Sequence, residues 1–294
     1  MLRNQIVMVA NKCNLSCTYC WYEVGSADYP QEQLAVADYE RWFAACARHD
    51  GLDSVSFTGG EPLLRADIME LLQVADRHAR STMLFTNGTL LRPESARALA
   101  ELGTQVHVSV DHVDLSIPDR VRGGTGASLQ ALDRLAEAEV RTVQICMVVT
   151  SRNWSQVTTM ARYAQDHGFG LELIPVGLPD SHPLSLRTLD REQIESLLEV
   201  LQTWSGLLGR KLYYRRFSAY LRESSLPVLR SCRAGDTGVY ITSDGSVTVC
   251  AQRAEVSLGN IRLDSPEEVA RAKEREVARR VPGACVKADC LVLV

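Results

Sequence analysis

The stretch Cys13-Asn-Leu-Ser-Cys17-Thr-Tyr-Cys20 places three cysteines directly after an apolar run of strand length, Gln5–Ala10. Thiolates prefer zinc ions or iron–sulfur clusters to hard cations. A structural zinc site takes four ligands, usually in C-x2-C pairs, and the spacing here supplies three. We therefore expect a four-iron four-sulfur cluster with one iron open to an outside ligand, rather than three ordinary buried cysteines.

Strand-like and helix-like segments alternate after this stretch. Strands are expected at Gln5–Ala10, Val55–Phe57, Met83–Phe85, Val106–Val110, Thr142–Val149 and Leu171–Ile174, and helices at 31–49, 66–79, 93–102, 127–138 and 155–167. Regular alternation of this kind predicts an α/β fold with a parallel sheet. Six such units are fewer than the eight that close a barrel.

Composition limits the class of protein. With 294 residues, 46% of them hydrophobic and 23% charged, the chain is an ordinary globular protein of one or two domains. A net charge of -4 provides no basic surface for nucleic acid or for an anionic membrane. No signal peptide or membrane-spanning run is evident, so we expect a cytoplasmic protein. Nine cysteines then favour metal binding, because disulfides rarely persist in that compartment.

The C-x3-C-x2-C run, with the aromatic Tyr19 before its last cysteine, resembles the signature of radical S-adenosylmethionine (radical SAM) enzymes. The resemblance implies that Cys13, Cys17 and Cys20 hold a 4Fe–4S cluster that binds and cleaves S-adenosylmethionine. The resulting 5'-deoxyadenosyl radical would take a hydrogen atom from the substrate, and a flavodoxin- or ferredoxin-type protein would supply the electron. It also implies a partial (β/α)6 TIM-like barrel, with Tyr19 near the adenine.

Motifs after the later strands extend this resemblance. Thr58-Gly-Gly-Glu-Pro62 is similar to the family's GGEP element, in which the Gly59–Gly60 backbone and Glu61 bind the methionyl ammonium; the alternative is a plain turn. The other cofactor-binding residues that the resemblance implies are Asn87 in a Thr-Asn-Gly turn, Ser109, Thr150, Asn153 and Ile174. Asp111 is expected to reach either cofactor or substrate, and Arg122 is either a partner for the cofactor carboxylate or a solvated loop charge.

The C-terminal third holds four more cysteines, Cys232, Cys250, Cys285 and Cys290. An expected hairpin with a Ser-Asp-Gly turn lies between the first two. Spacing alone fits one zinc ion or one cluster. The C-x17-C hairpin followed by Leu258-Gly-Asn-Ile261 is similar to the shortened SPASM module called a twitch domain, which implies a second, auxiliary 4Fe–4S cluster. The last pair, C-x4-C, departs from the family's more usual C-x2-C.

The expected organisation is a radical SAM core at 1–176, a linker and amphipathic helix at 177–229, and a twitch domain at 230–294. An aromatic patch of Tyr213, Tyr214, Phe217 and Tyr220 is expected to pack in the core or at a domain interface rather than to line the substrate site.

The resemblance implies one of two substrate classes, small sugars and aminocyclitols or peptides. About three residues precede the first strand, so no leader-binding module is expected and a small substrate is favoured. We expect epimerisation of an amino sugar or aminoglycoside in antibiotic biosynthesis. The alternative reactions are dehydrogenation of an aminocyclitol and peptide maturation. The remaining alternative is a zinc-binding scaffold without catalysis. Epimerisation needs a thiol hydrogen donor. Cys250 is one candidate if the auxiliary cluster keeps only three protein ligands, and Cys146 is the other if its side chain points into the barrel. Otherwise Cys146 and Cys46 are inert core cysteines.

Overall fold

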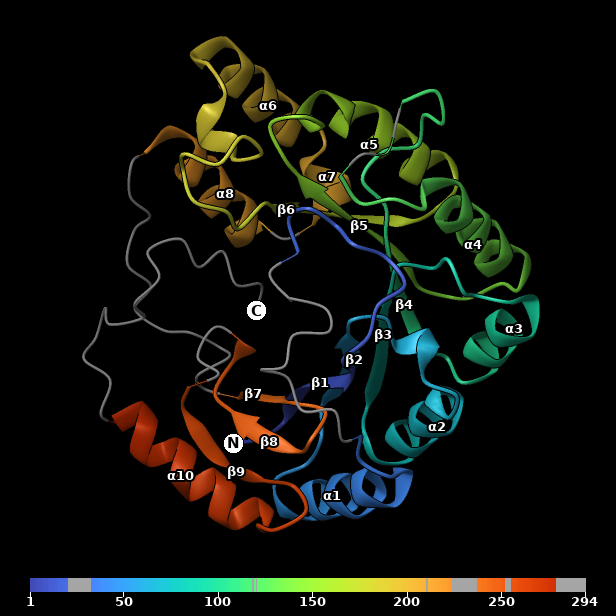
Figure 1. The fold of residues 1–294 in the computed structure, drawn as a ribbon, viewed down its shortest axis with the longest axis vertical. Coiled ribbons are helices and arrows are strands. Elements are labelled where there is room, and N and C mark those ends of the chain that lie inside the picture. Colours follow the sequence, from blue (N-terminus) through green and yellow to red (C-terminus); the bar gives the residue numbers. More distant parts are fainter. Residues whose placement is uncertain are drawn as a thin grey trace.

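The computed structural model describes residues 1–20, 33–117, 119, 121–209, 211–223, 237–251 and 255–278. Strands and helices alternate along the first part of the chain, and the helices form an arc outside the strands (Figure 1). The elements are β1 (Asn4–Ala10), α1 (Val36–His49), β2 (Ser54–Gly59), α2 (Ile68–His78), β3 (Ser81–Thr86), α3 (Pro93–Glu101), β4 (Gln105–Ser109), α4 (Thr125–Glu137), β5 (Val143–Val149), α5 (Val157–Asp166) and β6 (Gly170–Pro175). Every predicted strand is present, within two residues of its expected bounds.

One predicted helix begins later than expected. The α1 helix starts at Val36 rather than at residue 31, because Ala35 is extended and its N–H donates to the Asp38 carboxylate over 3.3 Å. An acidic side chain that accepts from the backbone in the first turn fixes a helix start in this way.

The first six strands form one parallel sheet in the order β6-β5-β4-β3-β2-β1. Among the described residues, β6 pairs with β5 alone, so the curved sheet does not close on itself. This arrangement is a partial (β/α)6 TIM-like barrel, as predicted. Its strands all end at the same edge, and the loops after them build the candidate site.

Successive side chains of each strand face opposite sides of the sheet. On the outer side, apolar residues such as Val7, Phe57, Leu84 and Ile145 are fully buried against the helices. Burying an apolar side chain of this size stabilises the fold by about 1.5–3 kcal/mol. The inner side is more polar; its strand positions include Ser54, Ser56, Gln105, His107, Ser109, Gln144, Cys146 and Glu172.

Helices after β6 cover the free edge of that strand. They are α6 (Arg191–Thr203), α7 (Ser205–Leu208) and α8 (Lys211–Arg222). Asp190 caps α6 by accepting from the N–H of Gln193 over 2.9 Å. On α8, the Tyr213 hydroxyl donates to the Leu173 carbonyl over 2.9 Å, and the Tyr214 hydroxyl accepts from the Leu173 N–H over 3.0 Å. The predicted aromatic patch is therefore buried packing that also protects a sheet edge.

The C-terminal part continues the same sheet on its other side. It contains β7 (Gly238–Ile241), β8 (Ser246–Thr248), β9 (Ser257–Asn260) and α10 (Pro266–Ala278). The predicted hairpin is present as β7 and β8, and β7 runs parallel to β1, with Ile6 opposite Tyr240. Within the described ranges, the result is one nine-stranded sheet ending in β1-β7-β8-β9. Strands of the expected core and strands of the expected C-terminal module therefore belong to one continuous sheet.

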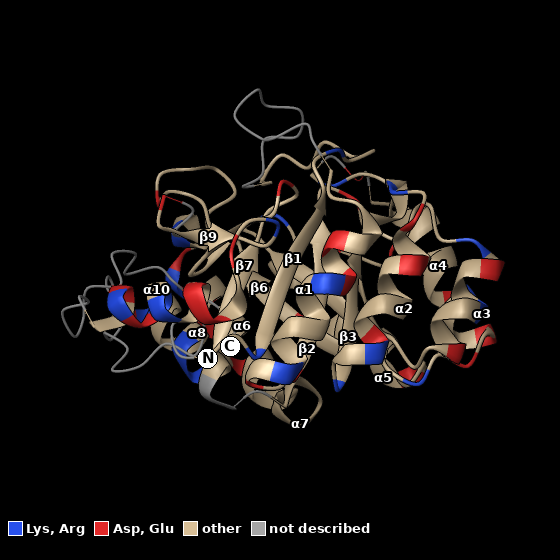
Figure 2. Cartoon of the chain, turned by 90° about the horizontal axis from the view of Figure 1, so that it is seen from below, with Lys and Arg blue, Asp and Glu red and all other residues tan. Residues whose placement is uncertain are grey.

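Charged residues occur mainly on the helices and loops, with both signs intermixed, whereas the strands contain few of them (Figure 2). In the part of the chain that the structure describes, no helix has the length and apolar character that crossing a membrane requires.

Candidate active site

The cysteine loop lies at the carboxyl end of β1. Cys13 and Cys17 are half-buried and Cys20 is exposed. Burial raises the pKa of Cys13, and it raises the pKa of Cys17 to about 11. Thiolates at such positions need a compensating positive charge, which a bound iron–sulfur cluster supplies. The chemistry of this donor set fits the predicted cluster.

The glycine turn after β2 packs directly against the cysteine loop. The N–H of Gly60 donates to the Ala10 carbonyl and the N–H of Glu61 to the Lys12 carbonyl, both over 2.8 Å. A Cβ on Gly60 would lie 2.2 Å from the Lys12 oxygen, and one on Gly59, whose φ is +145°, 2.5 Å from the Ala10 oxygen. Only glycine allows this approach. The two motifs that the sequence singled out are therefore in contact.

Glu61 joins the ends of β2 and β3. Its side chain is 0% exposed and accepts from the Thr86 hydroxyl over 2.6 Å, the Asn87 N–H over 2.7 Å and the Leu63 N–H over 3.0 Å. Burial raises the pKa of Glu61, although these hydrogen bonds oppose that shift. Both carboxylate oxygens of Glu61 thus accept hydrogen bonds from the protein itself. The expected contact of Glu61 with the methionyl ammonium of the cofactor stays a prediction.

Asp111, Tyr19 and Arg122 form a buried group above the end of β4. Arg122 pairs with both Asp111 oxygens at 3.2 Å, and the Tyr19 hydroxyl donates to the same carboxylate. The Val148 N–H also donates to Asp111, over 3.0 Å. Arg122 lies over the Tyr19 ring at 5.4 Å, and its side chain is 10% exposed. Arg122 is therefore not a solvated loop charge.

The loop that carries Arg122 is organised by Asp119. Its carboxylate accepts from the N–H groups of Arg122, Gly123 and Thr125 at 3.2, 2.8 and 3.2 Å, and from the Thr125 hydroxyl. The same loop contacts the cysteine loop, because the Thr18 N–H donates to the Val121 carbonyl over 2.8 Å. Sequence reasoning did not single out Asp119, although Asp side chains commonly accept hydrogen bonds from nearby backbone N–H groups in turns.

Asn87, Thr150 and Asn153 support the site through their own hydrogen bonds. Asn87 donates to the Asn14 side chain over 2.9 Å and lies 3.8 Å from the Cys13 sulfur. Asn153 accepts from the Thr150 N–H over 2.7 Å and donates to the Val148 carbonyl over 2.8 Å. These residues lie at the strand ends where the sequence placed them. Their expected contacts with the cofactor remain predictions.

The inner face of the barrel carries the remaining predicted residues. Ser109 lies opposite Cys146 in the β4–β5 register, and Ile174 is on β6. Cys146 points inward and contacts His107 and Glu172 rather than the apolar core. Sequence reasoning missed His107 and Glu172, yet each stands two residues before a predicted site residue and so shares its face.

Cys46 is an inert core cysteine, as expected. It is buried on α1, its sulfur accepts from the Gln5 amide over 3.3 Å, and burial raises its pKa to about 12. Cys250 follows β8 and is half-buried. The other predicted ligands of the auxiliary cluster, Cys232, Cys285 and Cys290, lie outside the described residues.

Comparison with known proteins defines the class. Residues 7–164 match the radical SAM superfamily and residues 232–290 match the SPASM iron–sulfur cluster-binding domain. The chain therefore belongs to the radical SAM superfamily, in its twitch/SPASM-type subgroup, and is a radical SAM enzyme. Its cofactors are S-adenosylmethionine and two 4Fe–4S clusters, as the sequence predicted.

Individual relatives differ in reaction. The chain is 27% identical to the AdoMet-dependent heme synthase of Oleidesulfovibrio alaskensis, across 90% of this chain and 74% of that protein. Among solved structures, anSMEcpe with bound AdoMet has a TM-score of 0.74 at 22% identity, across 95% of this chain and 84% of that one. BtrN in complex with AdoMet and 2-DOIA has a TM-score of 0.56 at 16% identity, across 96% and 88%. These structural likenesses establish the fold alone.

Proposed function

We propose that the chain is a radical SAM epimerase that inverts a carbinol carbon of an amino sugar or aminoglycoside in antibiotic biosynthesis. The observation that carries the proposal is the Cys146 thiol on the inner side of the sheet, in addition to the N-terminal triad. A redox-neutral inversion needs such a thiol, because the substrate radical must receive a hydrogen atom from the face opposite to the one that lost it.

The residues around the cysteine loop have distinct roles in this proposal. Cys13, Cys17 and Cys20 hold the first cluster, which, with S-adenosylmethionine bound, supplies the radical that removes the substrate hydrogen. The Gly59–Gly60 backbone lies beside these cysteines with no side chain in the way. Asp111, tied to Tyr19 and Arg122, holds both side chains at the strand ends. We expect Asp111 to act as a positioning residue.

Two thiols are candidates for the hydrogen donor. Cys146 faces the barrel interior from the middle of β5. Cys250 lies beside Ala251, which packs on the small cluster of Met8 and Tyr240 at the inner side of β1 and β7. Either thiol would give its S–H hydrogen to the substrate carbon, and the sulfur radical left behind would regain one electron from the reductant and one proton from solvent.

The polar inner face supports a small hydroxylated amine as substrate. Hydroxyl and amide side chains at strand positions, among them Ser56, Ser109, Gln105 and Gln144, offer donors and acceptors for sugar hydroxyl groups. The fold shared with BtrN, which was solved with 2-DOIA, supports the same substrate class.

Two other functions have specific support. Dehydrogenation of an aminocyclitol alcohol is favoured by the iron–sulfur domain match at 232–290, since a second cluster can accept an electron. Peptide modification is favoured by the fold shared with anSMEcpe, which was also solved with the Kp18Cys peptide.

The test is anaerobic turnover of the reconstituted enzyme with candidate aminoglycosides in deuterated water, following product mass and 5'-deoxyadenosine. Epimerisation predicts a product of unchanged elemental composition that carries one deuterium. A product lighter by two hydrogens would establish dehydrogenation instead, and consumption of a precursor peptide alone would overturn the small-substrate proposal.

Variants identify the donor. The donor's alanine variant, Cys250→Ala or Cys146→Ala, is expected to form 5'-deoxyadenosine without epimerised product. Cys46→Ala, which removes a thiol outside the barrel interior, is the matched control and should still give product.

A further inference from the structure

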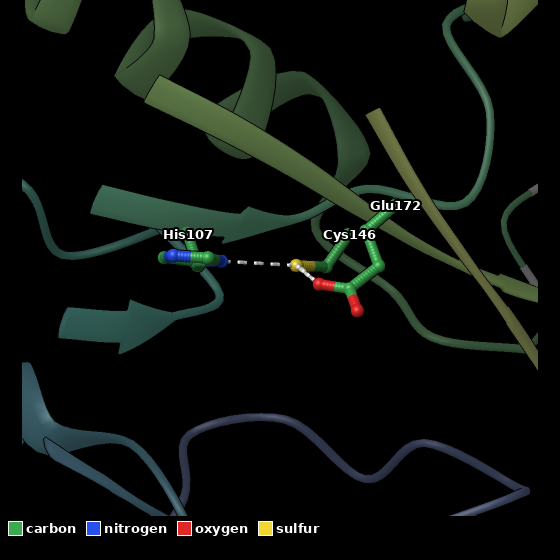
Figure 3. Close-up of side chains that lie close together, drawn as sticks. All are labelled: His107, Cys146 and Glu172. Atoms are coloured by element: carbon green, nitrogen blue, oxygen red, sulfur yellow. Dashed lines mark hydrogen bonds between the residues drawn. The ribbon is translucent and has the colours of Figure 1, made fainter. Parts of the chain in front are cut away.

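Three side chains with metal-binding atoms converge on the inner face of neighbouring strands (Figure 3). They are His107 on β4, Cys146 on β5 and Glu172 on β6. The Cys146 sulfur lies 3.7 Å from His107 Nδ1 and 3.8 Å from Glu172 Oε2, and all three atoms lie within 4.8 Å of one another. The strand register brings these side chains together. Cys146 is paired with Glu172 across β5 and β6, and His107 is paired with Gln144, two residues before Cys146 on the same face of β5.

The two contacts of the Cys146 sulfur are close to the spacing of ligands around one ion. Zinc binds sulfur at about 2.3 Å and imidazole nitrogen or carboxylate oxygen at about 2.0–2.2 Å, so two ligands at the tetrahedral angle lie roughly 3.3–3.6 Å apart. The sulfur contacts, at 3.7 and 3.8 Å, exceed this range by a few tenths of an ångström. The ligand atoms of His107 and Glu172 lie within 4.8 Å of each other, so side-chain rotations of these two residues must bring their atoms closer when an ion binds.

The cluster is also buried and held in place. Cys146 and Glu172 are each 5% exposed. The His107 ring stacks on Phe85 with centroids 4.3 Å apart and planes 26° from parallel, which fixes the direction of the imidazole. A site on strands with supported side chains keeps its geometry better than a site on loops.

We propose that His107, Cys146 and Glu172 bind one divalent transition-metal ion, with a fourth coordination position left for a ligand from the barrel interior. The combination of thiolate, imidazole and carboxylate selects zinc or a similar ion over magnesium or calcium. Thiolate and carboxylate together balance the two positive charges. Three protein ligands with one further position is the pattern of zinc sites that act on a substrate rather than of purely structural ones.

This inference stands independently of the proposed function, but it has a consequence for it. A metal-bound thiolate carries no S–H hydrogen, so Cys146 would not be the hydrogen donor. Cys250 would then be the donor, with the auxiliary cluster held by the other three C-terminal cysteines. The fourth position would then take a hydroxyl or amine group of the substrate and fix its orientation.

The alternative is a hydrogen-bonded cluster without metal, in which the Cys146 thiol donates to Glu172. Zinc binding to the fully reconstituted enzyme distinguishes the two, because the iron–sulfur clusters then occupy their own cysteines. After incubation with zinc and desalting under anaerobic conditions, we expect one zinc per chain by elemental analysis. X-ray absorption at the zinc edge should show one sulfur ligand, with nitrogen and oxygen as the others.

Variants locate the site. His107→Ala and Cys146→Ala should weaken zinc binding more than about 100-fold, since even the loss of an outer-shell partner costs 10–100-fold. Gln144→Ala, on the same strand and face, is the matched control and should keep the zinc. Iron content must stay unchanged in all three, which shows that each variant folds and holds its clusters.

Several outcomes would overturn the proposal. They are the absence of bound zinc in the wild-type enzyme, a zinc environment of sulfur atoms only, and zinc retained by both alanine variants. Each of these results concerns metal binding, so the mass of the turnover product would still test the epimerase proposal separately.

Discussion

Replacing Glu61 by glutamine tests whether this carboxylate serves the fold or the cofactor. One of its oxygens accepts from the Leu63 N–H and the Thr86 hydroxyl, and the other accepts from the Asn87 N–H. A glutamine would place its NH2 group at one of these two positions. In either orientation that group faces a backbone N–H, which cannot rotate away, so one buried donor loses its partner.

The expected cost follows from these contacts. A hydrogen bond to a charged group contributes about 1.5–3 kcal/mol, and a buried donor left unpaired costs about 1–3 kcal/mol. Burial disfavours the charged carboxylate and raises its pKa, which offsets part of this loss. We therefore expect Glu61→Gln to destabilise the fold by about 2–4 kcal/mol, which lowers the apparent Tm by roughly 4–8 °C for a chain of this size.

The assay is anaerobic thermal unfolding followed by circular dichroism, together with the Kd for S-adenosylmethionine. Glu101→Gln, on the exposed end of α3, is the control and should leave both quantities unchanged. A Glu61→Gln enzyme with a Tm within about 1 °C of the wild type would refute the reasoning from hydrogen bonds. If its cofactor affinity fell at the same time, the carboxylate would be a direct ligand of the methionyl ammonium.

Three more changes probe the scaffold. Burial alone would raise the pKa of Asp119, but hydrogen bonds from the Thr125 hydroxyl and neighbouring N–H groups hold it below its usual value. Ionised Asp119 therefore stabilises the folded state at a pH above about 3.9, and this contribution is lost as the pH falls. The Asp119→Asn variant should accordingly show a stability that depends less steeply on pH in the acid range, as followed by circular dichroism. Tyr213→Phe should lower the free energy of unfolding by about 1 kcal/mol and speed amide hydrogen exchange in β6. Unchanged exchange rates would mean that the edge of β6 is protected without the Tyr213 hydroxyl. Lys273→Met removes hydrogen bonds of 2.8 and 2.7 Å to the carbonyls of Met1 and Gly238, so we expect the denaturant midpoint of unfolding to fall. An unchanged midpoint would contradict a role for Lys273 in joining α10 to the sheet.

Local sequence signals predicted the strands well because each signal lies within the strand itself. Apolar runs such as Thr142–Val149 needed no knowledge of distant residues to be recognised. The pairing of β7 with β1 had no such signal. Gly238–Ile241 indicates a strand, but its partner lies more than 230 residues earlier, and nothing in either segment specifies the other.

The candidate site likewise combines residues that local sequence signals predict with contacts that they do not. Tyr19 was predicted because the spacing of the cysteine run carries a family signature, and Arg122 because a guanidinium group can pair with the cofactor carboxylate. The contact between them depends on where the loops fold, which spacing does not encode. His107 and Glu172 were missed because the recognisable motifs follow the ends of the strands, whereas these residues lie in the middle of theirs.

The parallel pairing of β7 with β1 affects how the protein is made. During synthesis at about 5–20 residues per second, more than 230 residues must follow β1 before its second neighbour exists, a delay of roughly 12–47 s. Once β6 has been made, and until β7 follows, the newly made barrel presents an unpaired edge at β1, the strand that carries the exposed Ile6 side chain. A truncated chain that stops at the end of α8 would keep that edge permanently open, and aggregation of such a fragment would reflect the missing strand rather than an unstable barrel.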